Sequence, residues 1–267
     1  MKKNYLINQI QHKKSFLCVG LDTDITKIPK HLLGHSDPMF EFNKIIIDTT
    51  KDFCVSYKIN TAFYESMGLK GWETMEKTLH YIPNTHFKIA DAKRGDIGNT
   101  SKQYAKTFFE TLPFDAITIN PYMGEDSVRP FLEYENKWSI VLGLTSNLGA
   151  NDIQKLNVDN TPLYKNVIKN ISNWGNEDNL MFVVGATKAN ELKEIREIIP
   201  NNFILVPGIG AQGGNLEEVC NYGLNKDYGL LLNISRDIIY SSDKEDFSEK
   251  SLDRVLWYKS QIEKYFS

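Results

Sequence analysis

Cysteine is scarce in this chain, and its three copies lie far apart. Cys18, Cys54 and Cys220 are an odd set among 267 residues and match no metal-binding or redox spacing. This pattern excludes a small disulfide-stabilised fold and a cysteine-based zinc site. We expect three reduced thiols in a cytoplasmic protein.

A long apolar run is also missing. The opening segment MKKNYLINQIQHKKSF is basic but has no apolar block behind its charges, so we expect no secretory signal. No apolar stretch approaches the roughly 20 residues that cross a bilayer. We therefore predict no membrane partner.

Neither sign of charge is in large excess, and histidine is rare. The 31 basic and 34 acidic residues give a net charge of −3, which gives no reason to expect nucleic acid as a partner. Of the five histidines, His31 and His35 form a close pair in HLLGH, but a glycine separates them and no acidic third ligand follows in register. We predict no metal site there.

Short apolar, β-branched segments do recur, with amphipathic stretches between them. Several are apolar almost throughout, as is typical of parallel strands buried on both faces; they span 16–22, 54–60, 86–93, 116–122, 138–145, 180–187, 203–209 and 229–235. Helical patterns between or after them span 37–53, 71–82, 188–200 and 246–265.

Eight strands that alternate with helices predict an α/β fold, a (β/α)₈ TIM barrel. We expect a single domain over 1–267, with a short N-terminal extension at about 1–15 and a C-terminal helix at about 246–265. The alternative, a doubly wound open sheet, normally has fewer strands. The widest gap between strands contains SNLGANDIQKLNVDNTP, a length typical of a lid or a binding loop.

Polar residues gather at the carboxyl ends of these strands, where such barrels have their active sites. They are Asp22, Lys58, Asn60, Asp91, Lys93, Asn120, Thr145 and Ser146. Because strand side chains alternate, Asp91 and Lys93 share one face, and so do Lys58 and Asn60. Paired charges from several strands at one end favour a functional site over a salt-bridge cluster that merely fills the barrel.

The segment GIGAQG at 208–213 matches the spacing G-x-G-x-x-G, but its position argues against a dinucleotide site. It follows the seventh strand, and no acidic residue ends the next one. The loops after strands seven and eight commonly bind phosphate in these barrels, and Arg236 directly follows the eighth. We interpret PGIGAQGG together with NISR as a phosphate cradle.

Taken together, the motifs resemble those of the orotidine 5′-phosphate decarboxylase family, in its longer bacterial and protozoal-like branch. They span residues 16 to about 240 and are GLD, YKIN, DAKRGDIGNT, NPYMG, LTSN, VPGIGAQGG and NISRDI. The resemblance implies a pyrimidine nucleotide substrate with a 6-carboxylate, products uridine 5′-monophosphate and carbon dioxide, and no metal or organic cofactor. It also implies a charge network of Lys58, Asp91, Lys93 and Asp96 that stabilises and protonates a carbanion at C6.

The same resemblance assigns the individual residues. Lys93 would donate the proton, and Asp91 would either stress the leaving carboxylate or hold Lys93 charged and aimed. Lys58 would bridge Asp91 and the ribose. Asp96 and Thr100 would reach the site of a partner in a homodimer. Asp22 would bind the ribose and Ser146 the base. Gln212 would connect the base to the phosphate, which the Ser235 amide and Arg236 would hold. Asn60 and Pro207 complete the substrate-binding set.

One departure and two alternatives accompany this assignment. Many relatives have glycine before the phosphate-binding arginine, whereas this chain has Ser235, which keeps the amide donor. Barrels that share D-x-K-x-x-D but use Mg²⁺ to stabilise an enediolate would be expected to place an acidic ligand at Lys58. A catalytically inactive nucleotide sensor is the other alternative, and the intact Asp91, Lys93 and Asp96 argue against it.

Overall fold

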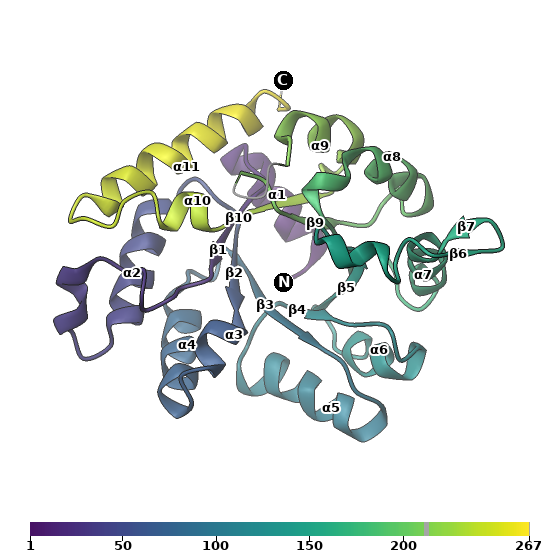
Figure 1. The fold of residues 1–267 in the computed structure, drawn as a ribbon, viewed down its shortest axis with the longest axis horizontal. Helices are drawn as coiled ribbons and strands as arrows, with labels where there is room; N and C mark the ends of the chain where they lie inside the picture. The colour runs from purple at the N-terminus through teal and green to yellow at the C-terminus, as the bar shows by residue number, and fades with distance from the viewer. Residues whose placement is uncertain (211–213, 267) are drawn as a thin grey trace.

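Eight parallel strands close into a barrel at the centre of the molecule (Figure 1). The computed structural model describes residues 1–210 and 214–266. Around the barrel the strands follow the order β1-β10-β9-β8-β5-β4-β3-β2. Their bounds are β1 Leu17–Leu21, β2 Ser56–Asn60, β3 Phe87–Arg94, β4 Ala116–Ile119, β5 Trp138–Leu144, β8 Leu180–Val184, β9 Ile204–Pro207 and β10 Leu230–Ile234. The predicted single-domain (β/α)₈ barrel is confirmed.

Helices surround the barrel on all sides (Figure 1). The α-helices are α1 Lys3–Lys13, α2 Pro38–Thr50, α3 Thr61–Glu65, α4 Leu69–Tyr81, α5 Gly98–Lys106, α6 Glu125–Leu132, α7 Leu163–Ser172, α8 Ala189–Ile198, α9 Leu216–Gly223, α10 Arg236–Ile239 and α11 Phe247–Glu263. Shorter turns are η1 Lys30–Gly34, η2 Thr107–Thr111, η3 Leu148–Asn151 and η4 Ala186–Lys188. In the described part of the chain, no helix combines the length and apolarity that crossing a bilayer requires.

The strands are apolar because both of their faces are covered. Every residue of β1, β8 and β10 is buried. Where the strands begin, the rings of Phe87 and Phe203 pack edge-on against Trp138. Burying a side chain of this size contributes about 1.5–3 kcal/mol to folding, so this end of the barrel is a packed core and leaves the other end for polar chemistry.

Helix α1 covers the end of the barrel where the strands begin. Its Leu6 and Ile10 are fully buried. The buried ammonium of Lys3 lies 3.0 Å from Glu177 and 3.2 Å from Asp227, which precede β8 and β10. The sequence indicated only an N-terminal extension here. The structure shows a helix that closes the barrel.

The long segment between β5 and β8 contains a small hairpin of β6 Asn157–Val158 and β7 Thr161–Pro162. Gln154 ties this segment to the barrel mouth, because its side chain accepts from the Thr145 amide and donates to the Thr145 hydroxyl, both at 2.8 Å. The predicted lid or binding loop is therefore anchored beside the end of β5.

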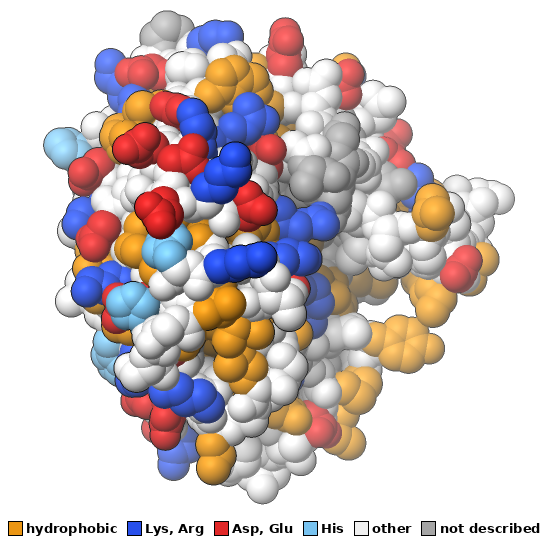
Figure 2. Space-filling view, turned by 60° about the vertical axis from the view of Figure 1, so that its left-hand side comes forward, with side chains coloured by type: hydrophobic (Ala, Val, Ile, Leu, Met, Phe, Trp, Pro, Cys, Tyr) orange, Lys and Arg blue, Asp and Glu red, His pale blue; other side chains and the backbone are white. Residues whose placement is uncertain are grey.

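The outer surface mixes the two signs of charge. In the face that Figure 2 brings forward, acidic and basic side chains lie intermixed around small apolar patches. This arrangement matches the near balance of basic and acidic residues in the sequence.

Candidate active site

A cavity of about 430 Å³ opens where the barrel strands end. Its wall includes polar or charged side chains from β2, β3, β4 and β10 and from the segments that follow β1, β5 and β10. The lining residues are Asp22, Lys58, Asn60, Asp91, Lys93, Thr118, Leu142, Thr145, Ser146, Asn147, Val183, Leu205, Pro207, Gly208, Ile209, Asn233, Ser235, Arg236 and Asp237. Leu142, Val183, Leu205 and Ile209 add an apolar wall, so the cavity combines charge with a surface suited to a flat ring.

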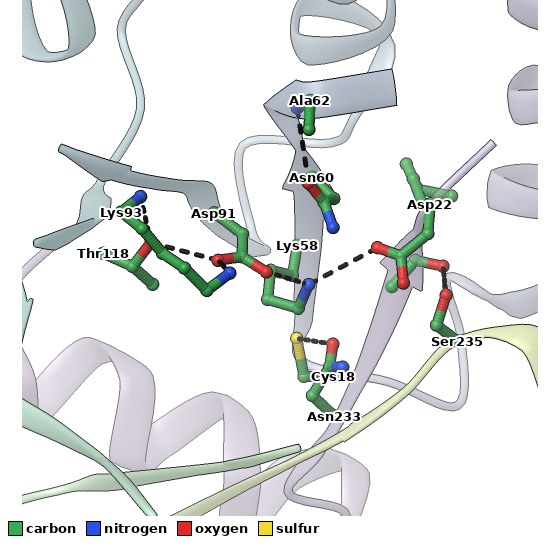
Figure 3. Close-up of polar contacts among 12 residues, drawn as sticks. Cys18, Asp22, Lys58, Asn60, Ala62, Asp91, Lys93, Thr118, Asn233 and Ser235 are labelled. Atoms are coloured by element: carbon green, nitrogen blue, oxygen red, sulfur yellow. Dashed lines mark hydrogen bonds and ion pairs between the residues drawn. The ribbon is translucent and has the colours of Figure 1, made fainter. Parts of the chain in front are cut away.

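Four charged side chains form a chain of ion pairs at one end of this cavity (Figure 3). Lys58 Nζ lies 2.7 Å from Asp91 Oδ2 and 3.4 Å from Asp22 Oδ1. Lys93 Nζ lies 2.5 Å from Asp91 Oδ1. In the β2–β3 register, Asn60 lies opposite Asp91, which brings Lys58 and Asp91 to one side of the barrel mouth.

Burial and pairing have opposite effects on these groups. Burial alone would raise the pKa of Asp91, but the Lys58 and Lys93 ammonium groups hold it well below its usual range. Burial alone would lower the pKa of Lys58, but the Asp22 and Asp91 carboxylates raise it above its ordinary value. The lowered pKa of Asp91 stabilises the fold at pH values above the pKa that this carboxyl has in the unfolded chain. The raised pKa of Lys58 stabilises the fold at pH values below the pKa that this lysine has in the unfolded chain. The pair therefore stays charged through neutral pH.

Lys93 has a backbone conformation that is unusual for lysine. Its φ of 47° lies in the left-handed region, which costs an L-residue about 1–2 kcal/mol. The β3–β4 register shifts between Ala90 and Arg94 at the same place. The Thr118 hydroxyl accepts from the Lys93 amide at 2.9 Å and donates to Asp91 Oδ1 at 3.1 Å. Thr118 thus joins the strained backbone to the ion-pair chain.

Arg94, the residue after Lys93, fixes the end of β3. The guanidinium of Arg94 pairs with Glu65 and lies over the rings of Tyr104 and Phe108, with centroid distances of 5.4 and 5.5 Å. The Arg94 carbonyl accepts from the Asn120 amide at 2.8 Å. These contacts hold the point at which the chain leaves the strand.

The opposite end of the cavity is built from the loops after β9 and β10. Pro207, Gly208, Ile209, Ser235 and Arg236 line it. The Ser235 hydroxyl donates to the Gly20 carbonyl at 3.1 Å, and a Cβ added at Gly20 would lie 2.7 Å from Ser235 Cβ. Serine fits at 235 because residue 20 is glycine.

Ser146 is brought close to the end of β8 by another glycine. A Cβ added at Gly185 would lie 2.8 Å from Ser146 Cβ. Beside it, the Thr145 hydroxyl donates to Asn147 Oδ1 at 2.6 Å. The polar wall near Ser146 therefore depends on close packing of β5 against β8.

Most of the predicted site residues surround this one cavity. Those in its lining are Asp22, Lys58, Asn60, Asp91, Lys93, Ser146, Pro207, Ser235 and Arg236.

Asp96 and Thr100 are not in the described lining: Asp96 Oδ1 accepts from the Ile97 amide at 2.8 Å, and Thr100 is exposed on α5. Asn120, which the strand ends also suggested, is exposed and not in that lining. Gln212 lies outside the described residues.

Four polar lining residues were given no role of their own by the sequence: Thr118, Asn147, Asn233 and Asp237. Thr118 and Asn233 each interrupt an otherwise apolar strand, in AITI and LLLNI. A lone polar residue in a buried strand was the signal that could have found them. Asp237 lies within the short helix after Arg236 and gave no such signal.

The donor set fits an ammonium better than a metal ion. Across the described residues, no group of three or more His, Cys, Asp or Glu side chains is arranged to hold a cation. Both carboxylates that line this end, Asp22 and Asp91, face Lys58 Nζ. The lysine therefore occupies the position between two carboxylates that a cation would require.

Known proteins resemble this chain over nearly its whole length. The model of the "Orotidine 5′-phosphate decarboxylase / HUMPS family" matches residues 15–250. A protein named orotidine 5′-phosphate decarboxylase from Christiangramia forsetii is 60% identical to this chain, over 93% of each. Another of that name, from Flavobacterium johnsoniae, is 58% identical, over 98% of this chain and 97% of its own.

Solved structures agree with the sequence comparison. A putative orotidine-monophosphate decarboxylase from Toxoplasma gondii has a TM-score of 0.86 at 34% identity, covering 98% of each chain. The OMP decarboxylase of Leishmania donovani has a TM-score of 0.82 at 34% identity, covering 97% of this chain and 99% of its own.

Proposed function

Since the chain belongs to the orotidine 5′-phosphate decarboxylase / HUMPS family, we propose that it converts orotidine 5′-phosphate to uridine 5′-monophosphate and carbon dioxide, the last step of UMP synthesis. The observation that carries the proposal is the Lys58–Asp91–Lys93 chain of ion pairs at one end of a cavity whose other end contains Arg236. The proposal includes a cytoplasmic location, with which the buried free thiols are compatible.

The proposed chemistry needs no cofactor. The bond between C6 and the carboxylate carbon breaks, carbon dioxide leaves, and the electron pair stays on C6. The Lys93 ammonium stabilises this charge and then gives C6 a proton, and lysine regains a proton from water. Half of the Lys93 side chain is exposed to the cavity and solvent, which leaves its head accessible to a bound ring.

Asp91 is proposed to keep Lys93 aimed. It is 9% exposed and bonded to both lysines, and these two ammonium groups keep it ionised despite its burial. It is also proposed to face the carboxylate that departs. Lys58, bound to Asp22 and Asp91, is proposed to connect this pair to the ribose, with Asp22 accepting from a ribose hydroxyl.

The remaining wall is proposed to bind the rest of the nucleotide. Ser146 reads the pyrimidine edge, and Asn60 and Pro207 complete the wall. The Ser235 amide and Arg236 hold the phosphate. Binding energy from a remote phosphate can be used to organise the reacting end, which explains why a decarboxylase retains an anion site.

Turnover in the presence of a chelator tests the reaction. Purified protein should convert orotidine 5′-phosphate at an unchanged rate with EDTA, measured by loss of ring absorbance. Activity that disappears with EDTA and returns with Mg²⁺ would move the assignment to the metal-dependent enediolate chemistry. No conversion with or without Mg²⁺ would favour the inactive sensor.

The proposal extends to a homodimer in which Asp96 and Thr100 complete the partner's site. Both lie outside the lining of their own cavity, as far as the structure describes it. Nearby, Ile97, Tyr122 and Met123 are exposed apolar residues, with Tyr122 82% exposed, and such a patch favours an interface. In a two-fold dimer each subunit would complete the other.

Subunit mixing tests this sharing. Lys93→Ala and Asp96→Ala homodimers should each be severely impaired. After exchange, a mixed dimer holds one site with both defects and one intact site. Random 1:1 exchange makes half of the dimers mixed, so activity should recover to about a quarter of wild type per site. Recovery should be blocked by cross-linking the subunits beforehand. Activity that stays at the sum of the parents after verified exchange would assign Asp96 to its own subunit.

A further inference from the structure

A cluster of three side chains, Asp237, Arg254 and Tyr258, lies behind the Arg236 end of the cavity. Asp237, the residue after Arg236, lines the cavity. Its Oδ2 accepts from Arg254 Nε at 2.8 Å and from the Tyr258 hydroxyl, and it lies 2.6 Å from a terminal nitrogen of Arg254. Arg254 and Tyr258 both belong to α11, so this helix reaches the proposed phosphate site through one carboxylate.

The carboxylate of Asp237 presents an electrostatic difficulty. It is next in the chain to the arginine proposed to bind a phosphate dianion, and like charges close to each other in a protein repel. A bare aspartate here would oppose the ligand. Pairing with Arg254 removes most of that repulsion.

Arg254 is well fixed for this task. Its guanidinium lies over the rings of Trp257 and Tyr258, with centroid distances of 4.7 and 4.9 Å. Burial alone would lower its pKa, but Asp237 and Tyr258 raise it. The arginine therefore remains a charged partner of Asp237 and is oriented by both aromatic rings.

Tyr258 joins the same cluster to the loop after β9. Its side chain is 1% exposed. A Cβ added at Gly210 would lie 2.6 Å from the Tyr258 hydroxyl and 3.2 Å from Asp237 Oδ2, and Gly210 has a φ of 81°. Tyr258 thus lies against the backbone of the loop after β9, at Gly210, and against Asp237, which follows β10.

We propose that Arg254 and Tyr258 are positioning residues for the phosphate of the nucleotide, acting through Asp237 and Gly210. Arg254 neutralises Asp237 so that the cavity end accepts a phosphate monoester. Tyr258 holds the two loops at the spacing that this group needs. The inference rests on the proposed function, since it takes the Arg236 end of the cavity as the phosphate site.

Binding of uridine 5′-monophosphate and of uridine, measured by calorimetry, tests the charge argument. Arg254→Met should weaken binding of the nucleotide about tenfold or more and change binding of the nucleoside less than about twofold. Adding Asp237→Asn should restore most of the lost affinity, because the unpaired carboxylate is gone. Lys250→Met, which removes a cation paired with Asp253 on the same helix, is the matched control and should change neither affinity.

The outcomes separate this inference from the proposed function. Wild-type protein that binds the nucleotide no more tightly than the nucleoside contradicts the phosphate site itself. Wild-type selectivity that persists in Arg254→Met overturns the inference alone. Equal loss for both ligands, or no rescue by Asp237→Asn, shows a general packing role and also overturns it. Arg254→Lys, which keeps the charge, covers the case in which Arg254→Met does not fold: it should retain more nucleotide affinity than Arg254→Gln.

Kinetics of Tyr258→Phe test the spacing argument. The substitution keeps the ring and removes the hydroxyl that lies against Gly210 and Asp237. KM should rise about three- to tenfold while kcat stays within about twofold, because a remote ground-state contact is affected. A fall in kcat with unchanged KM would contradict a role at the phosphate end.

Discussion

The two ends of the cavity are held in different ways. At one end, Lys58 and Asp91 lie within strands of the barrel and are 3% and 9% exposed. At the other end, Arg236 is exposed at the start of a four-residue helix, behind which stands the Asp237–Arg254–Tyr258 cluster. One end is fixed by strand register and buried charge, and the other by loops supported from an outer helix.

This difference matches two kinds of work. Charges that must be in place before the substrate arrives belong on strands, because the barrel holds them at little further cost. A site that closes on a flexible phosphate tolerates loops, because binding energy can order them. Variants at the strand end should therefore change chemistry and stability, whereas variants at the loop end should change affinity.

The largest expected effect is at Lys93. Lys93→Ala removes both the proton donor and the charge beside C6, so kcat should fall by about 10⁴-fold or more. Steady-state turnover and calorimetric binding of uridine 5′-monophosphate measure the two effects, and product binding should change far less than kcat. Lys106→Ala, on the exposed side of α5, is the control. Turnover within tenfold of wild type would remove Lys93 from the chemistry.

The next largest effect concerns stability at the strand end. Asp91→Ala leaves Lys58 buried with only the longer contact to Asp22, which should lower the free energy of unfolding by about 3 kcal/mol or more. Urea denaturation measures it. Asp48→Ala, which breaks an exposed pair with Lys51, should cost less than about 1 kcal/mol. Equal losses for the two variants would mean that the buried charges are not what fixes this end.

At the loop end, Arg236→Ala should mainly affect KM. Loss of a charged hydrogen bond to phosphate costs about 1.5–3 kcal/mol, about ten- to a hundredfold in KM, while kcat at saturation changes less. Because Arg236 is exposed, the urea midpoint should stay that of wild type. A kcat loss comparable with that of Lys93→Ala would erase the proposed division between the two ends.

The smallest effect is expected at Thr118. Thr118→Val keeps the side-chain shape but removes the bonds to the Lys93 amide and to Asp91, each worth about 1 kcal/mol. kcat should fall about three- to tenfold with KM nearly unchanged. Thr107→Val, which removes a bond to a helix carbonyl on the outer surface, should leave both constants as they are. A purely KM effect would place Thr118 with the binding groups.

The sequence predicted the strand end better than the loop end, for a physical reason. Strands buried on both faces must be apolar, so their ends and the polar residues beside them stand out, as in the segment that contains Asp91 and Lys93. Helix α1 and the cluster of Asp237, Arg254 and Tyr258 depend on contacts between segments far apart in the chain, and no local pattern records them. The left-handed backbone of Lys93 was equally hidden, because lysine gives no sign of it.

That backbone conformation has a consequence for selection. At φ of 47°, glycine is the residue that fits without strain. The free energy of unfolding of Lys93→Gly, measured by urea denaturation, should therefore exceed that of Lys93→Ala by about 1 kcal/mol. This order reverses the usual ranking, in which alanine stabilises an ordered backbone relative to glycine. Position 93 thus retains a residue that its own backbone conformation disfavours. The protein is less stable than it would be with glycine there, and the lysine places an ammonium group at the cavity.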